Sequence, residues 1–514
     1  MYPTSFSSLR CGIMKPAFPY SLLKAFGDTP NVPAFEYGSR VIKRGDILDL
    51  VARYTGGLRA SQVDLGPGDS IAIYTGVTPD AFAVQIAAHV LGLRVIGVKP
   101  GITTAQLLAI VGDAKLLIVD ETTRSEIESL PPITLEVVEL EILLGDASTI
   151  ATQGRLEDTA LVLFTSGTTG EPKGVECTYA ALTASWAWQR SAWDADTELM
   201  AARYGRFILF GTLASTVMFE HLGLCLTSGG TAIIPTTPLP LLKFPHVLSD
   251  LHISAALFTV PRLYHVLELL KSDASSFDLS HLRSIVVSGS PLPAQKLRAA
   301  IETLGDVVFN GYGMSETGLV CLLSAAHIKE QPSAINAVGR PFTGVQIQIR
   351  NDSGDALPLN ETGHVWVRTL GAFRGYTNEE STSVLDPGGW IWTRDLGSLG
   401  NLGFLYLTGR ARDIVIINAN VYYIGAIEHA LSSHPDVDAA YVVSIPDDNT
   451  GEAAAAFITV KKYRPYLDDL RALVREKVSP AAVPSVITVI DSVPVAPSGK
   501  PDKQALIGLI PRVK

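Results

Sequence analysis

Residues 163–175 read LFTSGTTGEPKGV, and this stretch carries a distinctive pattern of small, hydroxyl and charged residues. An apolar run leads into two Ser/Thr–Gly turns, and Lys173 follows at a fixed offset. Gly167 and Gly170 allow backbone angles that other residues avoid, so successive N–H groups can converge on an anion. The hydroxyl side chains add donors and Lys173 adds positive charge. The pattern predicts a loop that binds a polyphosphate.

The neighbouring segments support this interpretation over that of a solvated Ser/Thr/Gly turn. An apolar strand precedes the loop, and we expect the stretch TYAALTASWAWQR, residues 178–190, to be helical. A phosphate near a helix N-terminus also gains from the helix dipole. The loop is not a Walker A motif, because Pro172 rather than glycine precedes Lys173.

The first two thirds of the chain alternate short apolar strands with helical stretches. Such alternation indicates parallel sheets with helices on their faces. Ligands bind at the carboxyl ends of strands in open sheets of this kind. The expected strands are DSIAIYT (69–75), LRVIGV (93–98), LLIVD (116–120), TAIIP (231–235), AALFTV (255–260), SIVVSGS (284–290) and DVVFNGYG (306–313), with a helix over 79–92.

Beyond about residue 340 the pattern changes to alternating apolar and polar residues between Gly-rich turns, which is typical of antiparallel strands. After GRARD (409–413), about 100 residues show an α+β pattern that predicts a separate domain. The predicted fold is α/β: a large N-terminal domain of βα-layered sheets plus a small β-barrel, with a small mobile α+β C-terminal domain. The predicted boundaries are 1–409 for the N-terminal domain (barrel part about 335–409), 410–412 for the hinge and 413–514 for the C-terminal domain.

Composition narrows the functional classes. The 514 residues are 47% hydrophobic and 18% charged, which is typical of a globular protein. A net charge of -10 without a basic stripe argues against nucleic acid as a partner. The four cysteines lack metal-ligand spacing, so we expect reduced thiols in a cytoplasmic protein. No uncharged apolar run reaches ~18 residues, so we expect no membrane span.

With the loop and these elements in place, the chain resembles the adenylate-forming (ANL) superfamily, which includes acyl-CoA synthetases, nonribosomal-peptide adenylation domains and luciferases. The resemblance covers roughly residues 20–510. Beside the loop it is carried by NGYGMSETG (310–318), GHVWVRTLGAFRGYTN (363–378), GWIWTRDLG (389–397), GRARDIVIINANVYYIGAIE (409–428) and PVAPSGKPDK (494–503).

The resemblance implies a nucleotide site with ATP and Mg²⁺. It implies that Tyr312 stacks on adenine, that Glu316 holds Mg²⁺, and that Asp395 and Arg410 contact the ribose. The alternatives are a core tyrosine, a solvated glutamate and a surface ion pair of little energetic value. The implied nucleotide-binding residues are Thr165, Ser166, Gly167, Thr168, Thr169, Gly170, Lys173, Ser288, Gly289, Ser290, Asn310, Gly311, Tyr312, Gly313, Met314, Ser315, Asp395 and Arg410.

The resemblance also implies a reaction in two halves. A carboxylate attacks ATP to give an acyl-adenylate and pyrophosphate, with Lys500 and Glu316 as catalytic residues. A thiol of CoA or of a phosphopantetheine arm then displaces AMP. Arg412 occupies the hinge about which the C-terminal domain moves between the two halves.

The acid is predicted from the residues implied to line its pocket: Phe207, Phe210, Gly211, Gly289, Gly311 and Leu319. They are mostly apolar, which suits an aryl or medium-chain acid. Residues 201–219 contain no Asp or Glu to bind an α-amino group, so an α-amino acid is not expected. Two departures affect the second half-reaction: no histidine stands near 214–216, and Ala419 replaces the glycine usual in the thiol tunnel.

The leading hypothesis is an acid–thiol ligase that uses CoA, with a small-molecule acid as its partner. An enzyme that loads an acyl carrier protein is the first alternative. A catalytically inactive nucleotide-binding homologue is the second, although retention of Lys173, Glu316, Asp395 and Lys500 argues against it. An oxygenase like luciferase is a fourth possibility that no residue favours.

Overall fold

The computed structural model describes residues 17–128, 135–166, 172–237, 243–377, 384–410, 413–418, 420–447, 450–496 and 501–510. The chain forms two compact units, each described by itself. The first unit comprises residues 1–192, 209–236 and 373–378. The second comprises residues 193–208, 237–372 and 379–514.

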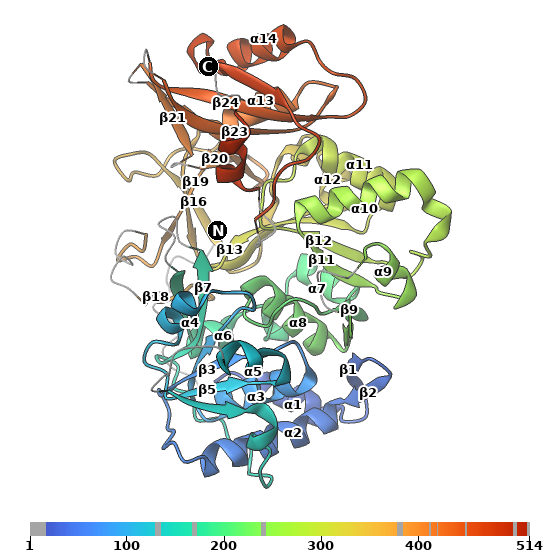
Figure 1. Ribbon diagram of the computed structural model, residues 1–514, viewed down its shortest axis with the longest axis vertical. Helices are drawn as coiled ribbons and strands as arrows, with labels where there is room; N and C mark the ends of the chain where they lie inside the picture. Colours follow the sequence, from blue (N-terminus) through green and yellow to red (C-terminus); the bar gives the residue numbers. More distant parts are fainter. Residues whose placement is uncertain are drawn as a thin grey trace. The chain divides into compact units, whose positions relative to one another are not determined.

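The first unit contains a seven-stranded sheet in the order β18-β8-β7-β4-β3-β5-β6 (Figure 1). Its central strands are parallel, and antiparallel β8 and β18 extend one edge. The strands are β3 (Ser70–Tyr74), β4 (Arg94–Gly97), β5 (Leu116–Val119), β6 (Glu136–Glu139), β7 (Thr159–Ser166), β8 (Pro172–Thr178) and β18 (Gly375–Tyr376). Three further strands of this unit are β1 (Pro33–Tyr37), β2 (Arg40–Lys43) and β10 (Thr231–Ile234).

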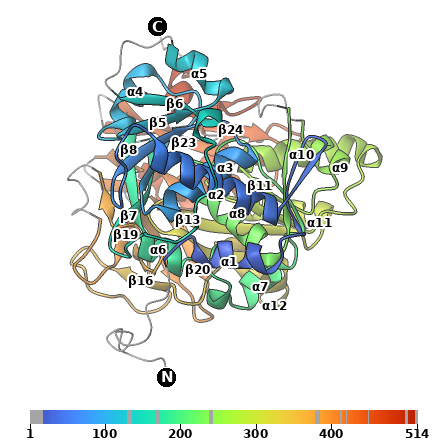
Figure 2. The ribbon, with the colours of Figure 1, turned by 90° about the horizontal axis from the view of Figure 1, so that it is seen from below.

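Helix α3 (Pro79–Val90) shows why the helices of this unit form where they do. The Thr78 side chain accepts a hydrogen bond from the Ala81 N–H, and Pro79 suits the first turn. Apolar residues surround the helix, so it is buried nearly all round, and it packs against α2 (Arg44–Ala60) (Figure 2). The other helices are α1 (Tyr20–Asp28), α4 (Thr104–Val111), α5 (Glu121–Glu128), α6 (Tyr179–Ala184) and α8 (Thr216–Ser228), with 3₁₀ turns at Leu140–Leu143 and Arg190–Ala192.

The second unit contains a sheet in which neighbouring strands follow the order β15-β14-β13-β12-β11-β9. Strands β11, β12 and β13 are parallel, and β14 turns back antiparallel to β13. The strands are β9 (Arg206–Ile208), β11 (Ala255–Phe258), β12 (Ser284–Val287), β13 (Val308–Met314), β14 (Gly318–Ser324) and β15 (Arg340–Pro341). The helices are α7 (Ala195–Ala201), α9 (His246–Asp250), α10 (Val260–Asp273), α11 (Ala294–Leu304) and α12 (Ala325–Glu330), with 3₁₀ turns at Ala274–Ser276 and Pro332–Asn336.

The strands expected beyond residue 340 are confirmed and pair antiparallel in the order β16-β17-β19-β20. Alternate residues such as Val365 and Val367 are buried in a common core with Leu405, which explains the period-2 pattern of the sequence. The strands are β16 (Gln346–Arg350), β17 (Gly363–Arg368), β19 (Ile391–Leu399) and β20 (Leu405–Arg410).

Residues 414–508 have a sheet and a core of their own. The sheet runs β22-β21-β24-β23, and β25 joins β24. Helices α13 and α14 cover it around Ile427, Leu431 and Leu470. The elements are β21 (Ile414–Ile417), β22 (Asn420–Tyr423), α13 (Ile424–Ser432), β23 (Val437–Asp447), β24 (Gly451–Val460), α14 (Leu467–Lys477), a 3₁₀ turn (Pro480–Ala482), β25 (Val486–Val489) and α15 (Lys503–Gly508). The domain boundary at 410–412 stays a prediction.

The helix predicted for residues 178–190 is largely wrong. Residues Pro172–Thr178 continue as a strand that pairs antiparallel with β7, so the Ser/Thr/Gly loop connects a β-hairpin. Helix α6 begins only at Tyr179 and ends at Ala184. The cross-strand pairing satisfies the backbone groups that a helix would otherwise satisfy, and it removes the helix dipole from the argument for phosphate binding.

Candidate functional site

The hairpin of the first unit holds the ends of the predicted phosphate loop. Thr165 lies opposite Lys173, and Ser166 lies opposite Pro172. Side-chain positions can be described here for Thr165 and Lys173, which are both partly buried. The loop residues Gly167, Thr168, Thr169 and Gly170 lie outside the described residues, so their role stays a prediction.

Three contacts fix the base of the hairpin. The Lys99 Nζ donates to the Phe164 carbonyl at 2.8 Å. The Lys173 Nζ lies 5.9 Å from the centre of the Tyr376 ring, and a Cβ on Gly174 would lie 2.7 Å from Thr377 Cγ2. Strand β18, which carries Tyr376, therefore packs closely on β8, and two lysines stand beside the loop.

The sequence interpretation missed Lys99. It follows β4, whose carboxyl end lies beside that of parallel β7, and its hydrogen bond to the Phe164 carbonyl brings its ammonium to the strand that enters the loop. The signal was available, because Lys99 directly follows the strand predicted for residues 93–98 and side chains at the carboxyl ends of adjacent parallel strands meet.

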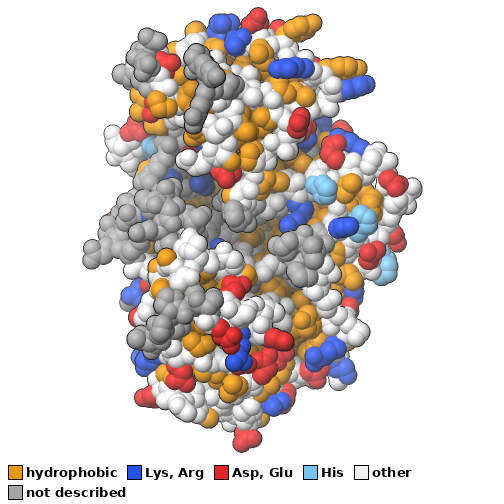
Figure 3. All heavy atoms as spheres, viewed as in Figure 1, with side chains coloured by type: hydrophobic (Ala, Val, Ile, Leu, Met, Phe, Trp, Pro, Cys, Tyr) orange, Lys and Arg blue, Asp and Glu red, His pale blue; other side chains and the backbone are white. Residues whose placement is uncertain are grey.

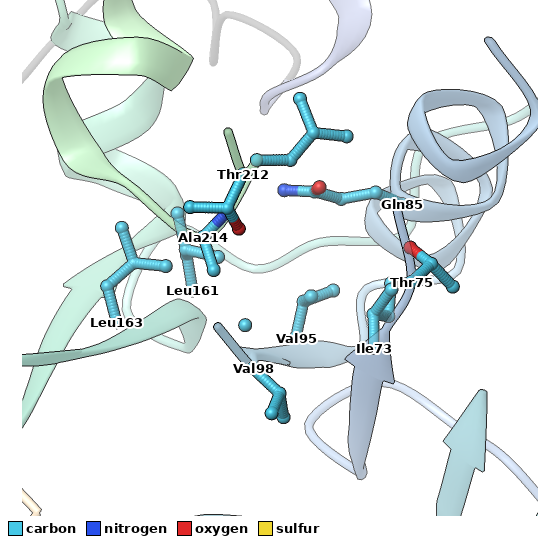
Figure 4. A pocket seen from close by; sticks show the side chains of 11 residues that line it. Ile73, Thr75, Gln85, Val95, Val98, Leu161, Leu163, Thr212 and Ala214 are labelled. Atoms are coloured by element: carbon cyan, nitrogen blue, oxygen red, sulfur yellow. The ribbon is translucent and has the colours of Figure 1, made fainter. Parts of the chain in front are cut away.

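A small cavity of about 20 Å³ lies in the first unit, at the same ends of β3, β4 and β7 (Figure 4). Its volume suits about one water molecule. The Gln85 side chain points across it toward the segment of Thr212 and Ala214, and Gly97 leaves no room for a side chain, since a Cβ would lie 2.9 Å from that of Ala214. The cavity thus lies behind the segment that carries Phe210 and Gly211.

In the second unit, Asp395 is held by two predicted site residues. The Tyr312 hydroxyl donates to Asp395 Oδ2 at 2.6 Å, and the Arg410 Nε donates to Oδ1 at 3.2 Å. Strands β19 and β20 place Asp395 opposite Arg410 in register. Asp395 is only 6% exposed, whereas the Arg410 side chain is 62% exposed, so the carboxylate is anchored from the protein side and the guanidinium lies toward solvent.

The electrostatics of this cluster follow from burial. Desolvation raises the pKa of Asp395, and the Arg410 charge and the Tyr312 hydrogen bond oppose that rise. Desolvation and the nearby Asp395 hold the pKa of Tyr312 well above its ordinary value. Tyr312 therefore remains a hydrogen-bond donor at neutral pH, and Asp395 accepts.

Asp395 follows a residue in an unusual conformation. Arg394 has φ +65°, in the left-handed region that favours glycine. Its Nε is buried and has no hydrogen-bond partner among the described residues. Glycine would adopt this backbone conformation without the steric cost that a Cβ brings.

Several other predicted nucleotide residues lie at the carboxyl ends of β12 and β13, in a different sheet from Asp395. Ser288, Gly289 and Ser290 directly follow β12, and Val287 at its end pairs with Asn310 on β13. Gly289 has φ +90° and a Cβ there would meet open space. The residues Gly311, Tyr312, Gly313 and Met314 continue β13, and Ser315 and Glu316 form the turn to β14.

Glu316 is the predicted magnesium ligand and is 9% exposed. A largely buried carboxylate in a tight turn suits a hard divalent cation that completes its shell with phosphate and water oxygens. The donor chemistry therefore fits Mg²⁺.

The predicted acid-pocket residues fall in both units. Phe210 and Gly211 belong to the first, and Gly211 has φ +83°. Phe207, Gly289, Gly311 and Leu319 belong to the second. Within the second unit, a Cβ on Gly311 would lie 2.9 Å from Leu319 Cδ1, so the leucine side chain packs closely on the Gly311 backbone. Lys500, Arg412 and Ala419 lie outside the described residues.

Among the described residues, no helix has both the length and the apolar character required to cross a bilayer.

Proteins similar to this chain include ligases and an amide bond synthetase. A fatty acid–[acyl-carrier-protein] ligase, ScoC, of Streptomyces coeruleorubidus is 26% identical and covers 92% of each chain. A feruloyl-CoA synthase of an Amycolatopsis species is 26% identical over 92% of this chain and 94% of its own. The structure of the amide bond synthetase McbA of Marinactinospora thermotolerans aligns with a TM-score of 0.80 and 27% identity, over 95% of this chain and 99% of that one.

Two family descriptions match the chain directly. Residues 23–377 match the AMP-binding enzymes, and residues 426–500 match the AMP-binding enzyme C-terminal domain. The first match alone spans more than half of the chain, and the observed α/β fold agrees with it. The chain belongs to the AMP-binding enzyme family, within the adenylate-forming superfamily, and is an AMP-forming ligase.

Proposed function

We propose that this enzyme activates an apolar aryl or medium-chain carboxylic acid with ATP and transfers the acyl group to the thiol of CoA. The observation that carries the nucleotide part is the cluster in which buried Asp395 accepts hydrogen bonds from Tyr312 and Arg410. A pre-oriented carboxylate beside a flat aromatic ring suits a nucleoside, because it can accept from ribose hydroxyls while the ring stacks on the base.

In the first half-reaction, a carboxylate oxygen of the acid attacks the α-phosphorus of ATP. The bond to the bridging oxygen breaks, and pyrophosphate leaves with its electron pair. The hairpin donors, Lys173 and Lys99 would hold phosphate oxygens, and Lys500 would neutralise charge on the reacting phosphate. Mg²⁺, when bound at Glu316, would supply further positive charge to the phosphates.

In the second half-reaction, a thiolate attacks the acyl carbonyl and AMP leaves. We assign residues 410–412 as the hinge that would exchange Lys500 for other groups between the two steps, and residues 413–514 as the moving domain. The charge of Arg412 suits an exposed linker.

The acid class is proposed from the lining. Phe207 and Phe210 are buried aromatic residues, and neither Asp nor Glu occurs in residues 201–219. Apolar walls favour apolar acyl groups through burial of their surface. An α-amino group would have no carboxylate partner on this segment.

A second candidate acceptor is an amine. The amide bond synthetase is similar over nearly the whole chain, and Ala419 replaces the glycine expected for a thiol tunnel. A third candidate acceptor is a phosphopantetheine arm, because one relative is an acyl-carrier-protein ligase.

Pyrophosphate exchange tests activation, using a panel of aryl and medium-chain acids with α-amino acids as a contrast. We expect exchange with apolar acids only, and a loss of at least ~100-fold in Lys500→Ala, as is typical when a transition-state charge partner is removed. Lys462→Ala, an exposed lysine of the same domain, is the matched control. Exchange with no acid, or full exchange by Lys500→Ala, contradicts the proposal.

The acceptor is tested separately. The preferred acid and ATP are supplied with CoA, a phosphopantetheinylated carrier protein or a simple amine, and the products are identified by mass spectrometry. Formation of the acyl-CoA at the highest rate is expected. Faster formation of an amide or an acylated carrier would assign the acceptor differently and leave the activation step intact.

A further inference from the structure

Two histidines and one aspartate of the second unit meet on its surface, away from the nucleotide cluster. Ligand atoms of His252, Asp278 and His281 all lie within 4.8 Å of one another, and all three residues are exposed. The two imidazole rings are 4.6 Å apart. Figure 3 shows histidine side chains gathered over α9 and α10.

We propose that His252, Asp278 and His281 form a zinc site. Imidazole nitrogen and carboxylate oxygen are the donors that Zn²⁺ takes in proteins, and three protein ligands leave a position for water. The same set suits Co²⁺ and Ni²⁺, whereas Mg²⁺ and Ca²⁺ prefer all-oxygen sites.

The backbone holds His252 in place. It lies two residues beyond α9 and has φ +50°, in the left-handed region where glycine is the usual residue. The His252 N–H donates to Ser249 O at 3.1 Å, and the Ile253 N–H donates to Leu248 O at 2.9 Å. These bonds close the end of the helix, and buried Ile253 anchors the turn.

The loop that carries the other two ligands is fastened to this turn. The Asp278 N–H donates to Ser249 Oγ at 3.0 Å, and the Phe277 ring contacts the His246 ring edge-on at 4.9 Å. Asp278 Oδ1 accepts from the Ser280 N–H at 2.9 Å, and the Ser280 side chain also hydrogen-bonds this carboxylate, so its orientation is fixed. A site whose ligands stand on ordered backbone loses less entropy on binding.

The position of the cluster predicts its role. His252 precedes β11 and His281 precedes β12, and these strands are parallel neighbours. The cluster therefore lies at their amino ends, whereas Ser288 and Gly289 of the nucleotide site follow the carboxyl end of β12. A zinc ion here would join the connection before β11 to the connection before β12, and it would stabilise the fold without contacting the reactants.

The test uses the full chain after treatment with EDTA, at about pH 7.5. Zn²⁺ is titrated by calorimetry, and Co²⁺ is followed by its visible absorption. We expect one ion per chain, a rise in Tm with Zn²⁺, and a Co²⁺ spectrum of nitrogen and oxygen ligands. His281→Gln, Asp278→Asn and His252→Asn, in which asparagine tolerates the left-handed backbone, should each weaken zinc affinity by at least ~10-fold.

His265→Gln is the matched control, because His265 is exposed on α10 and does not belong to the cluster. It should bind zinc like the unaltered chain. Each variant is checked without metal for an unchanged far-UV spectrum. The proposal is overturned if the unaltered chain takes up no zinc, if binding survives in His281→Gln and His252→Asn, or if Co²⁺ gives a thiolate charge-transfer band that assigns the ion to a cysteine.

Discussion

The Tyr312 hydroxyl and Asp395 Oδ2 are 2.6 Å apart, although 83 residues separate them in the chain. The tyrosine lies on β13 and the aspartate on β19, so two different sheets of the second unit contribute to one cluster. The hydrogen bond aims the carboxylate and fixes the ring beside it. This pairing joins a predicted adenine contact to a predicted ribose contact.

Tyr312→Phe tests that pairing, because it keeps the ring and removes the donor. A hydrogen bond to a charged group is worth about 1.5–3 kcal/mol, so kcat/KM for ATP should fall about 10- to 100-fold. Desolvation raises the pKa of Asp395, and the Tyr312 hydrogen bond opposes that rise. Loss of this hydrogen bond should therefore move the acidic limb of the pH profile to higher pH. Pyrophosphate exchange across pH measures both effects, and an unchanged profile would refute the assignment.

Arg394→Gly should stabilise the protein. Arg394 has φ +65°, and a left-handed backbone costs a residue with a Cβ about 1–2 kcal/mol. Glycine removes that cost but loses more entropy on folding, so the net gain should be about 0.5–1 kcal/mol. Urea denaturation measures it. Arg394→Lys retains both the charge and the strain and should show no gain, so equal stability of the two variants would contradict this explanation.

Glu428 should make stability depend on pH. Burial raises its pKa to about 7, and the Lys503 charge and the Val442 N–H only partly offset burial. A raised folded-state pKa means that the protonated form is favoured on folding, so this contribution is complete below about pH 4.5 and is lost as pH rises through 7.

Glu428→Gln keeps the Oε1 acceptor for the Val442 N–H, which lies 2.9 Å away. The variant should remove this part of the pH dependence and be the more stable protein above pH 7. Thermal unfolding of both proteins over pH 5–8 measures the difference, which we expect to widen as pH rises. A difference that is constant over this range would show that Glu428 is not the titrating group.

Lys296 and Asp438 form an ion pair between α11 and β23. The lysine is 6% exposed and its Nζ also lies 4.3 Å from the Tyr264 ring centre. Asp438→Asn leaves a buried ammonium without its carboxylate and should destabilise the protein by about 1–3 kcal/mol.

The double variant Lys296→Met/Asp438→Asn should recover much of that loss, because an apolar chain fills the site without an uncompensated charge. Glu302→Gln, an exposed change on α11, is the control and should be neutral. Chemical denaturation of the unaltered protein, Lys296→Met, Asp438→Asn and the double variant measures the coupling. Additive effects of the two substitutions would mean that the pair does not interact.

Much of the fold could be predicted from local pattern. Strand β3 is a run of apolar residues buried on both faces, and α3 carries its own start signals in Thr78 and Pro79. The alternating residues of β17 likewise indicate one buried face. These predictions succeed because periodicity and capping act over a few neighbouring residues.

The failure at residues 178–190 has the opposite origin. The segment TYAALTASWAWQR has helix-forming residues, yet its first residue, Thr178, is the last residue of β8, which pairs with β7. The pairing of β8 with β7 across the hairpin places a strand between the loop and the helix, and α6 then ends at Ala184. The helix predicted over residues 178–190 is therefore confirmed for Tyr179–Ala184 and wrong for residues 185–190.

The sequence alone determined the family, the class of nucleotide and which residue types carry the charges, because these reside in contiguous motifs. Only the tertiary structure decided that Asp395 accepts from Tyr312, that Lys99 reaches the strand entering the phosphate loop, and that His252, Asp278 and His281 share one surface. Those relationships join residues far apart along the chain, and strand order and register, which depend on packing of the whole fold, bring them within contact distance.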